Sequence, residues 1–427
     1  MINEIFFGNR YCKKEKNVVE YLLICIVGDY MYLSEKYSSI SPSSTLAIDS
    51  KFKEMKANGE DVVGFGAGEP DFDTPEHIRK AAIEAIETGF TRYTPASGTV
   101  ELKQAVVRKF ARDNGLEYKT ENIIISNGAK HSLVNALGAI LNPGDEVIVP
   151  TPCWVSYPEM VKLGDGVPVL VKATEEENFI VTAEKLEKAI TPKTRAVIIN
   201  TPSNPTGMVY PEDELRRIAQ LCVEKDLYII SDEIYEHLIY DGKKHFSIAS
   251  ISEEVKARSI IINGVSKTYA MTGWRIGYTA SDARIAKIMA NVQSHATSNP
   301  NSIAQKAAVA ALDGSMETVN AMLVEFEKRR NYMVERMNSI EGVSCIKPEG
   351  AFYVMMNISA LIGKKIDDTV IDGSDAFANA FLEKAKVAVV PCSGFDSDIH
   401  VRWSYATSME NIKEGLDRLE KFLSMLK

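Results

Sequence analysis

Apolar segments alternate with helical segments through the middle of the chain, and this alternation restricts the possible folds more than any other feature. Segments that read as buried strands cover residues 122–125, 146–149, 196–200, 227–231 and 259–262. Segments with apolar residues at helical spacing, such as residues 212–224, fall between them. Apolar strands separated by helices are typical of a mostly parallel sheet that helices cover on both faces. The sequence therefore predicts an α/β fold.

The two ends of the chain show a different pattern. Toward the N-terminus, a short strand at residues 62–65 lies among helical segments at residues 45–57, 75–86 and 100–114. Toward the C-terminus, a long helix is expected at residues 303–337, with Gly314 as a possible break. Short strands then alternate with helices, and these elements are expected at residues 351–356, 387–390, 400–405 and 411–426. Because 427 residues are enough for two domains with large cores, we expect the tail to form a smaller α+β domain.

Composition narrows the classes of function. The net charge of −9, without a sustained basic block, argues against binding to nucleic acid or to an anionic membrane. The six cysteines are scattered without a CxxC pair, as expected of reduced thiols in a cytoplasmic protein. The six histidines form no HExxH-type group, so we expect no metal site.

The first thirty residues stand apart from this organisation. Residues 21–27 are apolar and follow Lys13, Lys14 and Lys16, which is superficially similar to a secretory signal. The apolar run is too short to span a bilayer, and no small-residue cleavage site follows it. We expect residues 1–30 to be an extension outside the catalytic fold, or upstream sequence read before a true start at Met31, and we favour the second.

Lys267 is the first residue that points to a chemical activity. It lies just beyond the strand at residues 259–262, in the segment NGVSKTYAMTGWRIGY at residues 263–278. Burial would lower the pKa of this amine, and a lysine with a low pKa can attack a carbonyl carbon to form a Schiff base. Taken alone, a lysine in such a place more often pairs with a nearby carboxylate, so its neighbours must decide.

Two further candidates lie at strand ends. Asp232 follows the strand at residues 227–231, and open α/β sheets bind ligands at the carboxyl ends of their strands. The alternative role for Asp232 is to cap a helix. The turn at residues 126–129 joins a strand to a helix N-terminus, an arrangement that can bind a phosphate group, although most such turns are only connections.

Several separated motifs together resemble those of one enzyme family. They are SKTYAMTGWRIGY at residues 266–278, NTPSNPTG at 200–207, SDEIYEHLIY at 231–240, TPCWVSY at 151–157, HVRWSYATS at 400–408 and GAGEPDF at 66–72. They occur along the chain in the order found in the family, and from about Met31 onward they resemble class I aminotransferases, which are pyridoxal-phosphate enzymes of fold type I. The resemblance implies a large cofactor-binding domain at residues 76–304 and a discontinuous small domain at residues 31–75 and 305–427.

The resemblance also implies roles for single residues. Lys267 would carry the cofactor and act as the catalytic base, while Asp232 would pair with the ring nitrogen. The remaining cofactor contacts would come from Gly128, Ala129, Trp154, Asn204, Tyr235, Ser266, Arg275 and, across a homodimer interface, Tyr93 of the other subunit. The substrate α-carboxylate would bind to Arg402 and the backbone of Gly68, with Trp154 and Asn204 beside it.

The implied activity is a ping-pong transfer of an amino group from an amino acid to a 2-oxo acid, most plausibly 2-oxoglutarate. The bacterial-type aspartate aminotransferases resemble this chain most, and in them a lysine after the phosphate turn contacts the distal carboxylate of the substrate. Lys130 holds that position here, with Ser43, Ser44 and Thr45 as hydroxyl candidates. Ser41 stands where members that also transaminate prephenate carry a basic residue, which puts that activity in doubt.

Other activities are compatible with the same motifs. The substrate could be an aromatic or other amino acid, or the enzyme could be a carbon–sulfur lyase, because the cofactor carries the reaction and the pocket selects the bond. Aminotransferase-like domains also occur as ligand sensors in transcription regulators. Residues 1–30 are too short for the helix-turn-helix domain that such a regulator would need.

Overall fold

The computed structural model describes residues 32–42 and 44–427. The predictions for residues 1–30, including the apolar run at 21–27, therefore lie outside the described residues. The described chain divides into two units, one ending at Ser39 and one spanning residues 40–427. In the first, helix α2 (Glu35–Ser38) is capped by the Ser34 hydroxyl, which accepts a hydrogen bond from the Tyr37 N–H at 3.4 Å. All other elements below belong to the second unit.

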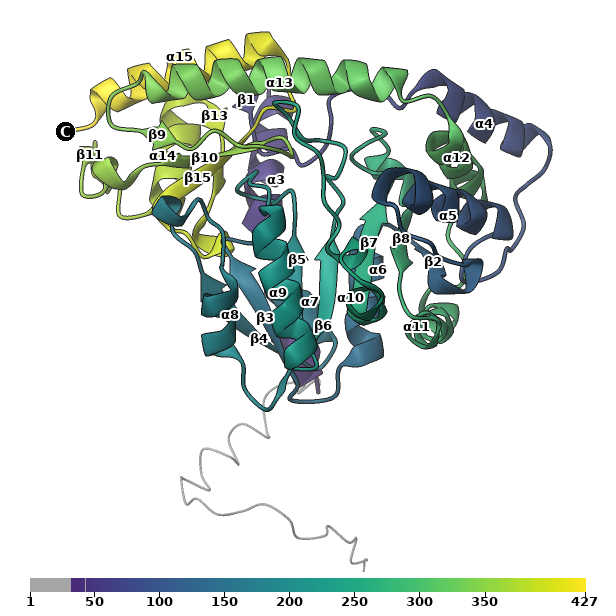
Figure 1. The fold of residues 1–427 in the computed structure, drawn as a ribbon. Coiled ribbons are helices and arrows are strands. Elements are labelled where there is room, and N and C mark those ends of the chain that lie inside the picture. Colours follow the sequence, from purple (N-terminus) through teal and green to yellow (C-terminus); the bar gives the residue numbers. More distant parts are fainter. Residues whose placement is uncertain (1–31, 43) are drawn as a thin grey trace, which may run out of the picture. The chain divides into compact units, whose positions relative to one another are not determined.

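A seven-stranded sheet forms the centre of the second unit (Figure 1). Its strands, in spatial order, are β2 (Ile123–Ser126), β8 (Gly277–Ala280), β7 (Ser259–Gly264), β6 (Tyr228–Asp232), β5 (Thr194–Asn200), β3 (Glu146–Thr151) and β4 (Val167–Lys172). The pairs from β7 to β4 are parallel, whereas β8 is antiparallel to both β2 and β7. The mostly parallel sheet predicted from the sequence is thus confirmed.

Helices cover both faces of this sheet. Successive strand residues point to opposite sides, so apolar side chains on each face need a layer of helices to bury them. Along β5, Ile198 packs into one buried apolar cluster, and Val197 and Ile199 pack into another. The first cluster includes α6 (Ala129–Ile140), α7 (Ser156–Leu163) and α11 (Ala283–Ala296). The second includes α8 (Ala183–Ala189), α9 (Glu212–Glu224) and α10 (Glu253–Arg258). The α/β prediction therefore holds for both layers.

Smaller sheets are formed by the two ends of the chain. Strands β14 (Val390–Pro391), β15 (His400–Ser404), β10 (Tyr353–Asn357) and β9 (Ser344–Cys345) form one antiparallel sheet. Strand β1 (Val63–Gly64) runs parallel to β13 (Val387–Ala388), and β11 (Lys365–Ile366) pairs with β12 (Thr369–Val370). The single strand predicted at residues 387–390 is wrong, because the segment changes partner from β1 to β15 between Ala388 and Val390.

The possible break at Gly314 in the long helix predicted at residues 303–337 is confirmed, and the segment forms two helices. Helix α12 (Ser302–Asp313) ends at Gly314, and α13 (Glu317–Asn338) begins three residues later. At Gly314 a Cβ atom would lie 2.4 Å from the Ala310 carbonyl oxygen and 2.7 Å from the His77 ring, so the chain turns where only glycine fits. Helix α13 then runs from α12 to the region of β9 and β10 (Figure 1).

The remaining helices complete the covering layers. They are α3 (Ser44–Ala57), α4 (Glu76–Glu87), α5 (Val100–Asn114), α14 (Ser374–Ala385) and α15 (Met409–Met425). Short 3-10 helices lie at Thr120–Asn122, Glu175–Glu177, Ile248–Ser250, Thr272–Trp274, Ser359–Leu361 and Ser393–Phe395. The division into domains at residues 75 and 304 stays a prediction, because residues 40–427 form one compact unit.

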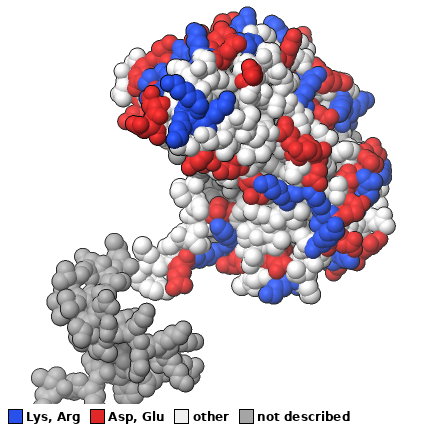
Figure 2. Space-filling model, turned by 90° about the vertical axis from the view of Figure 1, so that its left-hand side faces the viewer, with Lys and Arg blue, Asp and Glu red and all other residues white. Residues whose placement is uncertain are grey.

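The surface of the described residues carries both signs of charge. On the face drawn in Figure 2, acidic and basic side chains are interspersed. None of the helices in the described part of the chain has the length and apolar character needed to cross a bilayer.

Candidate active site

A cavity of about 520 Å³ lies where the carboxyl ends of β5, β6 and β7 meet segments of the smaller sheets. Most of the residues predicted for the site line it, namely Gly68, Ala129, Lys130, Trp154, Asn204, Asp232, Tyr235, Ser266, Lys267, Arg275 and Arg402. Parallel strands end at the same edge of a sheet, so side chains distant in sequence converge there. The fold therefore brings these residues together around one space.

Lys267 lies three residues beyond the end of β7, with its side chain half-buried at the cavity wall. Its ammonium group donates a hydrogen bond to the carbonyl oxygen of Gly68. Burial, helped by the charges of Arg402 and Arg275, lowers the pKa of this amine to about 8, against the opposing charges of Glu69 and Asp232. A substantial fraction of the amine is therefore unprotonated at mildly alkaline pH, as a nucleophile or base requires.

Asp232 is the last residue of β6, and it is buried. Its carboxylate accepts a hydrogen bond from the Tyr157 hydroxyl at 2.7 Å and another from the Ile234 N–H at 3.2 Å. Burial raises the pKa of Asp232 to about 6, while the two hydrogen bonds favour the charged form. Residues 234–237 form a turn, so this carboxylate caps no helix and is left facing the cavity.

The turn before α6 lies against Arg275. Gly128 has a φ of 86°, and a Cβ atom there would lie 2.2 Å from the Arg275 Nη2 atom. Arg275 donates hydrogen bonds to the carbonyl oxygens of Thr272 at 2.9 Å and Asn127 at 3.3 Å. The first N–H groups of α6 follow directly, at the positive end of the helix dipole. An anion could bind here, because the Arg275 guanidinium, the N-terminus of α6 and the buried Ser266 hydroxyl all offer hydrogen-bond donors.

Arg402 and Asn204 meet on the other side of the cavity. The Arg402 guanidinium donates hydrogen bonds to the Asn204 Oδ1 atom at 2.9 Å and to the Gly66 carbonyl oxygen at 3.0 Å. It lies 4.3 Å from the centre of the Tyr353 ring, and its buried Nε atom has no hydrogen-bond partner. A buried guanidinium with an unused donor is suited to a carboxylate, which accepts two parallel hydrogen bonds.

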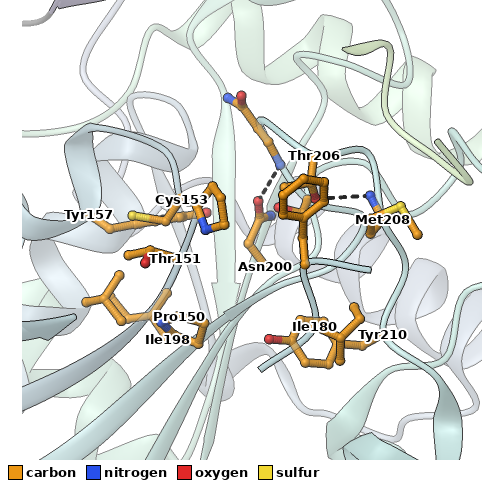
Figure 3. A pocket seen from close by; sticks show the side chains of 15 residues that line it. Pro150, Thr151, Cys153, Tyr157, Ile180, Ile198, Asn200, Thr206, Met208 and Tyr210 are labelled. Carbon is orange, nitrogen blue, oxygen red and sulfur yellow. Dashed lines mark hydrogen bonds between the residues drawn. The ribbon is translucent and has the colours of Figure 1, made fainter. Parts of the chain in front are cut away.

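The neighbouring polar groups hold these side chains in place. The Asn204 N–H donates to the Asn200 Oδ1 atom at 2.9 Å, and Asn200 in turn donates to the Asp232 carbonyl oxygen at 3.0 Å. The Tyr235 and Tyr353 hydroxyl groups lie 3.1 Å apart. A second, small cavity of about 20 Å³ lies behind Asn200 and Asn204, and Figure 3 shows its walls of apolar and hydroxyl side chains.

Lys130 and Trp154 stand together at the cavity mouth. The Lys130 ammonium nitrogen lies 4.7 Å from the centre of the Trp154 ring, a cation–π contact. Burial of the stem and the charge of Arg275 lower the pKa of Lys130. Lys130 is therefore directed into the site even though its side chain is exposed. Ser43 lies outside the described residues, as do the side chains of Ser44 and Thr45.

Tyr93 is the predicted residue that this chain does not bring to the cavity. Its side chain is 90% exposed, and it lines a separate surface hollow with Thr91 and Asn299. Gly128 does not line the cavity itself. The next residue, Ala129, does, and Gly128 lies against the Arg275 side chain.

Sequence reasoning missed three residues that support the site. Tyr157 lies one helical turn after Trp154 in TPCWVSY, and its hydroxyl reaches Asp232. Asn200 is the first residue of NTPSNPTG, where a polar residue at a strand end was an available signal. Tyr353 had no such signal, because an aromatic residue in a strand is typical of a core.

Comparisons with known proteins agree with this geometry. Residues 60–419 match the family described as aminotransferase class I and II. The chain is 52% identical over 391 residues to an aspartate aminotransferase of Bacillus sp. (strain YM-2), covering 92% of this chain and 99% of that protein. Its structure is similar to that of the aspartate aminotransferase from Rhizobium meliloti, with a TM-score of 0.90, 43% identity and coverage of 93% of this chain and 100% of that chain.

A second solved structure, aspartate aminotransferase from Thermus thermophilus with maleate, gives a TM-score of 0.87 at 42% identity, covering 92% of this chain and 100% of that chain. These similarities extend over both the seven-stranded sheet and the smaller sheets. The chain therefore belongs to the class I and II aminotransferase family.

Proposed function

We propose that this protein is a pyridoxal-phosphate-dependent aspartate aminotransferase with 2-oxoglutarate as amino acceptor. One observation carries the proposal: the half-buried amine of Lys267, with its lowered pKa, shares a cavity with the buried carboxylate of Asp232 and the buried guanidinium of Arg402. This chemistry needs three groups: an amine nucleophile, an anion that pairs with a cationic ring, and a cation that binds a carboxylate.

The residues around the cavity fit the cofactor. Arg275 and the N-terminus of α6 would hold its phosphate, and a side chain larger than glycine at position 128 would collide with Arg275. Asp232 is ionised at neutral pH and would keep the ring nitrogen protonated, with Tyr157 fixing its orientation. Asn204 and Tyr235 would bind the phenolic oxygen, and Trp154 would stack on the ring. When bound, pyridoxal phosphate supplies an electron sink for the pair left on the substrate Cα.

Lys267 would then serve as the base that removes the proton from the substrate Cα. With a pKa of about 8, its amine combines a usable unprotonated fraction with enough basicity to accept that proton. Arg402, which lines the cavity, would bind the α-carboxylate through its guanidinium group, together with the backbone of Gly68. The substrate would thus be held by one end while its Cα faces Lys267.

The preference for aspartate rests on Lys130. Its ammonium group lies at the mouth of the same cavity, where it can pair with a second carboxylate. The aspartate aminotransferase names of the relatives support the same choice, as does the dicarboxylate maleate named with the Thermus thermophilus structure. Ser41, whose N–H donates to Glu159 at 3.0 Å, stands where members that also transaminate prephenate carry a basic residue, so we propose no prephenate activity.

A homodimer is part of the proposal. Tyr93 is exposed and outside the cavity of its own chain, which is the position expected of a residue that serves the other subunit. Mixing inactive Tyr93→Phe and Lys267→Ala chains should restore part of the activity in hybrid dimers. A fully active monomer in sedimentation would contradict the shared site. A cytoplasmic location also stays a prediction.

A donor panel tests the function. Protein loaded with pyridoxal phosphate should show a visible absorbance band that Lys267→Ala lacks, and should transfer amino groups to 2-oxoglutarate fastest from aspartate. Lys130→Ala should reduce kcat/KM for aspartate about tenfold or more and leave alanine and phenylalanine nearly unchanged, because one charge pair at the cavity mouth is lost. Lys162→Ala, which removes a surface lysine paired with Glu159, is the control.

Two outcomes would redirect the proposal. Equal losses for all donors would exclude the role of Lys130, and a preference for an aromatic donor would exclude aspartate while leaving the aminotransferase. Ammonia and pyruvate formed without an acceptor would instead indicate a carbon–sulfur lyase.

A further inference from the structure

A buried group of charged side chains lies next to the active-site segments without lining the cavity. Asp232, at the end of β6, and Tyr235, in the turn that follows, line the cavity, whereas Glu236 does not. Glu236 is 6% exposed, and its carboxylate pairs with the ammonium group of Lys109, which is 1% exposed. The cofactor and substrate roles described above make no use of this pair.

Glu236 joins three segments of the chain. Its Oε1 atom accepts a hydrogen bond at 2.7 Å from Asn263 in β7, and its Oε2 atom accepts one at 3.1 Å from Asn114 at the end of α5. Lys109, also in α5, donates to the Asn114 side chain at 2.8 Å. Since Glu236 directly follows Tyr235 and Asn263 lies four residues before Lys267, this carboxylate links the two segments that carry the proposed catalytic groups.

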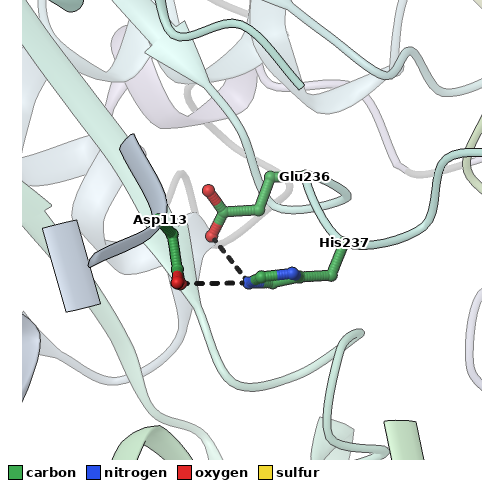
Figure 4. A group of neighbouring side chains, drawn as sticks. All are labelled: Asp113, Glu236 and His237. Carbon is green, nitrogen blue, oxygen red and sulfur yellow. Dashed lines mark ion pairs between the residues drawn. The ribbon is translucent and has the colours of Figure 1, made fainter. Parts of the chain in front are cut away.

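The same group has the residue types of a metal site. The Glu236 carboxylate, Asp113 and His237 bring their ligand atoms within 4.8 Å of one another, and Figure 4 shows both carboxylates directed toward the His237 ring. The Lys109 ammonium group already pairs with Glu236 and lies 3.9 Å from Asp113, so a cation is in place. The arrangement is that of an ion-pair network.

We propose that Glu236, held by Lys109, is a positioning residue that fixes the turn carrying Asp232 and Tyr235 against the strand end that precedes Lys267, through its hydrogen bond with Asn263. The two segments leave neighbouring parallel strands, which pair up to Asp232 and Ile262, and one further backbone hydrogen bond runs from the Glu233 N–H to the Ile262 carbonyl oxygen at 2.9 Å. Beyond that point the Asn263–Glu236 hydrogen bond joins them. A buried ion pair gives Glu236 little freedom to follow either segment alone. This inference rests on the proposed function.

Asn263→Ala tests the link, because it removes the contact between the segments and leaves the Glu236–Lys109 pair intact. A displacement of about 1 Å at reacting groups can lower turnover by up to about a hundredfold, so we expect kcat to fall at least about tenfold with KM for the amino donor changed less than about twofold. In the cofactor-free protein, amide hydrogen exchange should become faster in residues 232–238 and 264–270 while the global unfolding midpoint shifts little.

Asn122→Ala is the matched control. It removes hydrogen bonds to the Lys119 N–H and the Ser281 carbonyl oxygen, at the opposite edge of the same sheet. This variant should leave turnover and exchange at the two active-site segments unchanged. If Asn263→Ala does not fold, Asn263→Ser replaces it, because its hydroxyl is too short to reach Glu236.

The charged pair provides a second test. Lys109→Met alone should destabilise the protein by leaving a buried charge, and the double variant Lys109→Met with Glu236→Leu should recover stability without recovering turnover, because leucine cannot accept the Asn263 hydrogen bond. Recovery of both, or an Asn263→Ala enzyme within twofold of the wild-type kcat with unchanged exchange, would overturn the proposal. A wild-type protein without aminotransferase activity would refute the proposed function instead, and the exchange data would still decide the link.

Discussion

The buried amine of Lys267 should make the cofactor-free protein less stable than a variant without it. Folding transfers this amine from water, where its pKa is ordinarily 10.5, to a site where the pKa is about 8. At about 1.4 kcal/mol per pKa unit, the folded state loses about 3 kcal/mol for holding the charged form at neutral pH. Lys267→Met keeps the length of the side chain and removes this penalty. Subtracting about 1 kcal/mol for the lost hydrogen bond to Gly68 leaves a net stabilisation of about 2 kcal/mol.

The dependence on pH distinguishes this cause from improved packing. A lysine whose pKa falls on folding destabilises the protein fully below the folded pKa, here about 8, and no longer does so above the unfolded pKa of 10.5. The advantage of Lys267→Met should therefore be largest at pH 7, clearly smaller at pH 9 and lost or slightly reversed by pH 10.5.

The assay is urea unfolding of cofactor-free wild-type and variant protein at pH 7, 9 and 10.5, at one fixed protein concentration because subunit association would otherwise contribute. Lys80→Met, which removes an exposed lysine paired with Glu76, should change the unfolding free energy by less than about 0.5 kcal/mol at every pH. A Lys267→Met variant that is less stable at pH 7, or stabilised equally at all three pH values, would refute the reasoning.

Three further predictions concern the groups around Lys267. Gly128→Ala should weaken cofactor binding by about tenfold to a hundredfold in a fluorescence titration, because its backbone conformation is strained for alanine and its Cβ would displace Arg275; unchanged affinity would exclude this turn as the phosphate site. Tyr157→Phe should move the acidic limb of the pH–rate profile to higher pH, because the lost hydrogen bond lets the pKa of Asp232 rise above about 6; an unmoved limb would count against Asp232 as the titrating group. Burial acts to raise the pKa of Glu236, but the charge of Lys109, above all, holds the pKa at about 2, below the ordinary 4.5. The stability that this carboxylate contributes is therefore present above pH 4.5 and is lost as the pH falls toward 2. Glu236→Gln should flatten that loss in urea unfolding at pH 6, 4 and 3, and an identical pH profile would contradict the ion pair.

Local pattern was enough to predict most of the central sheet. Buried strands such as residues 196–200 are continuous apolar runs, and their alternation with helices indicates a mostly parallel sheet. Strand β4 was not predicted because it lies at the sheet edge with Val167 and Leu170 exposed, and β8 was not predicted because it is four residues long and begins with glycine. Their assignment depends on pairing partners that lie elsewhere in the chain.

The residues of the candidate site also fall into those that local motifs predict and those that depend on distant parts of the chain. Lys267, Asp232 and Arg402 could be proposed from motifs, and the structure brings them to one cavity. The Tyr157 contact to Asp232 and the Tyr353 contact to Tyr235 depend on distances across 75 and 118 residues of sequence, which no local spacing encodes. Tyr93 shows the opposite limit, because the role proposed for it in another subunit cannot be seen in the structure of a single chain.

The pairing of Val63 in β1 with Val387 in β13 has a consequence for how the chain folds while it is being synthesised. Arg402 reaches the Gly66 carbonyl oxygen across 336 residues of sequence, and Lys267 reaches Gly68 across 199. While the ribosome is still adding residues beyond Ala280, the emerging chain holds all seven strands of the central sheet, but Arg402 has not yet been added and the Gly66 carbonyl oxygen still lacks this partner. Contacts of such long sequence separation form late. The growing chain therefore completes the residues proposed to bind the cofactor before it completes the Arg402 contact proposed to serve the substrate.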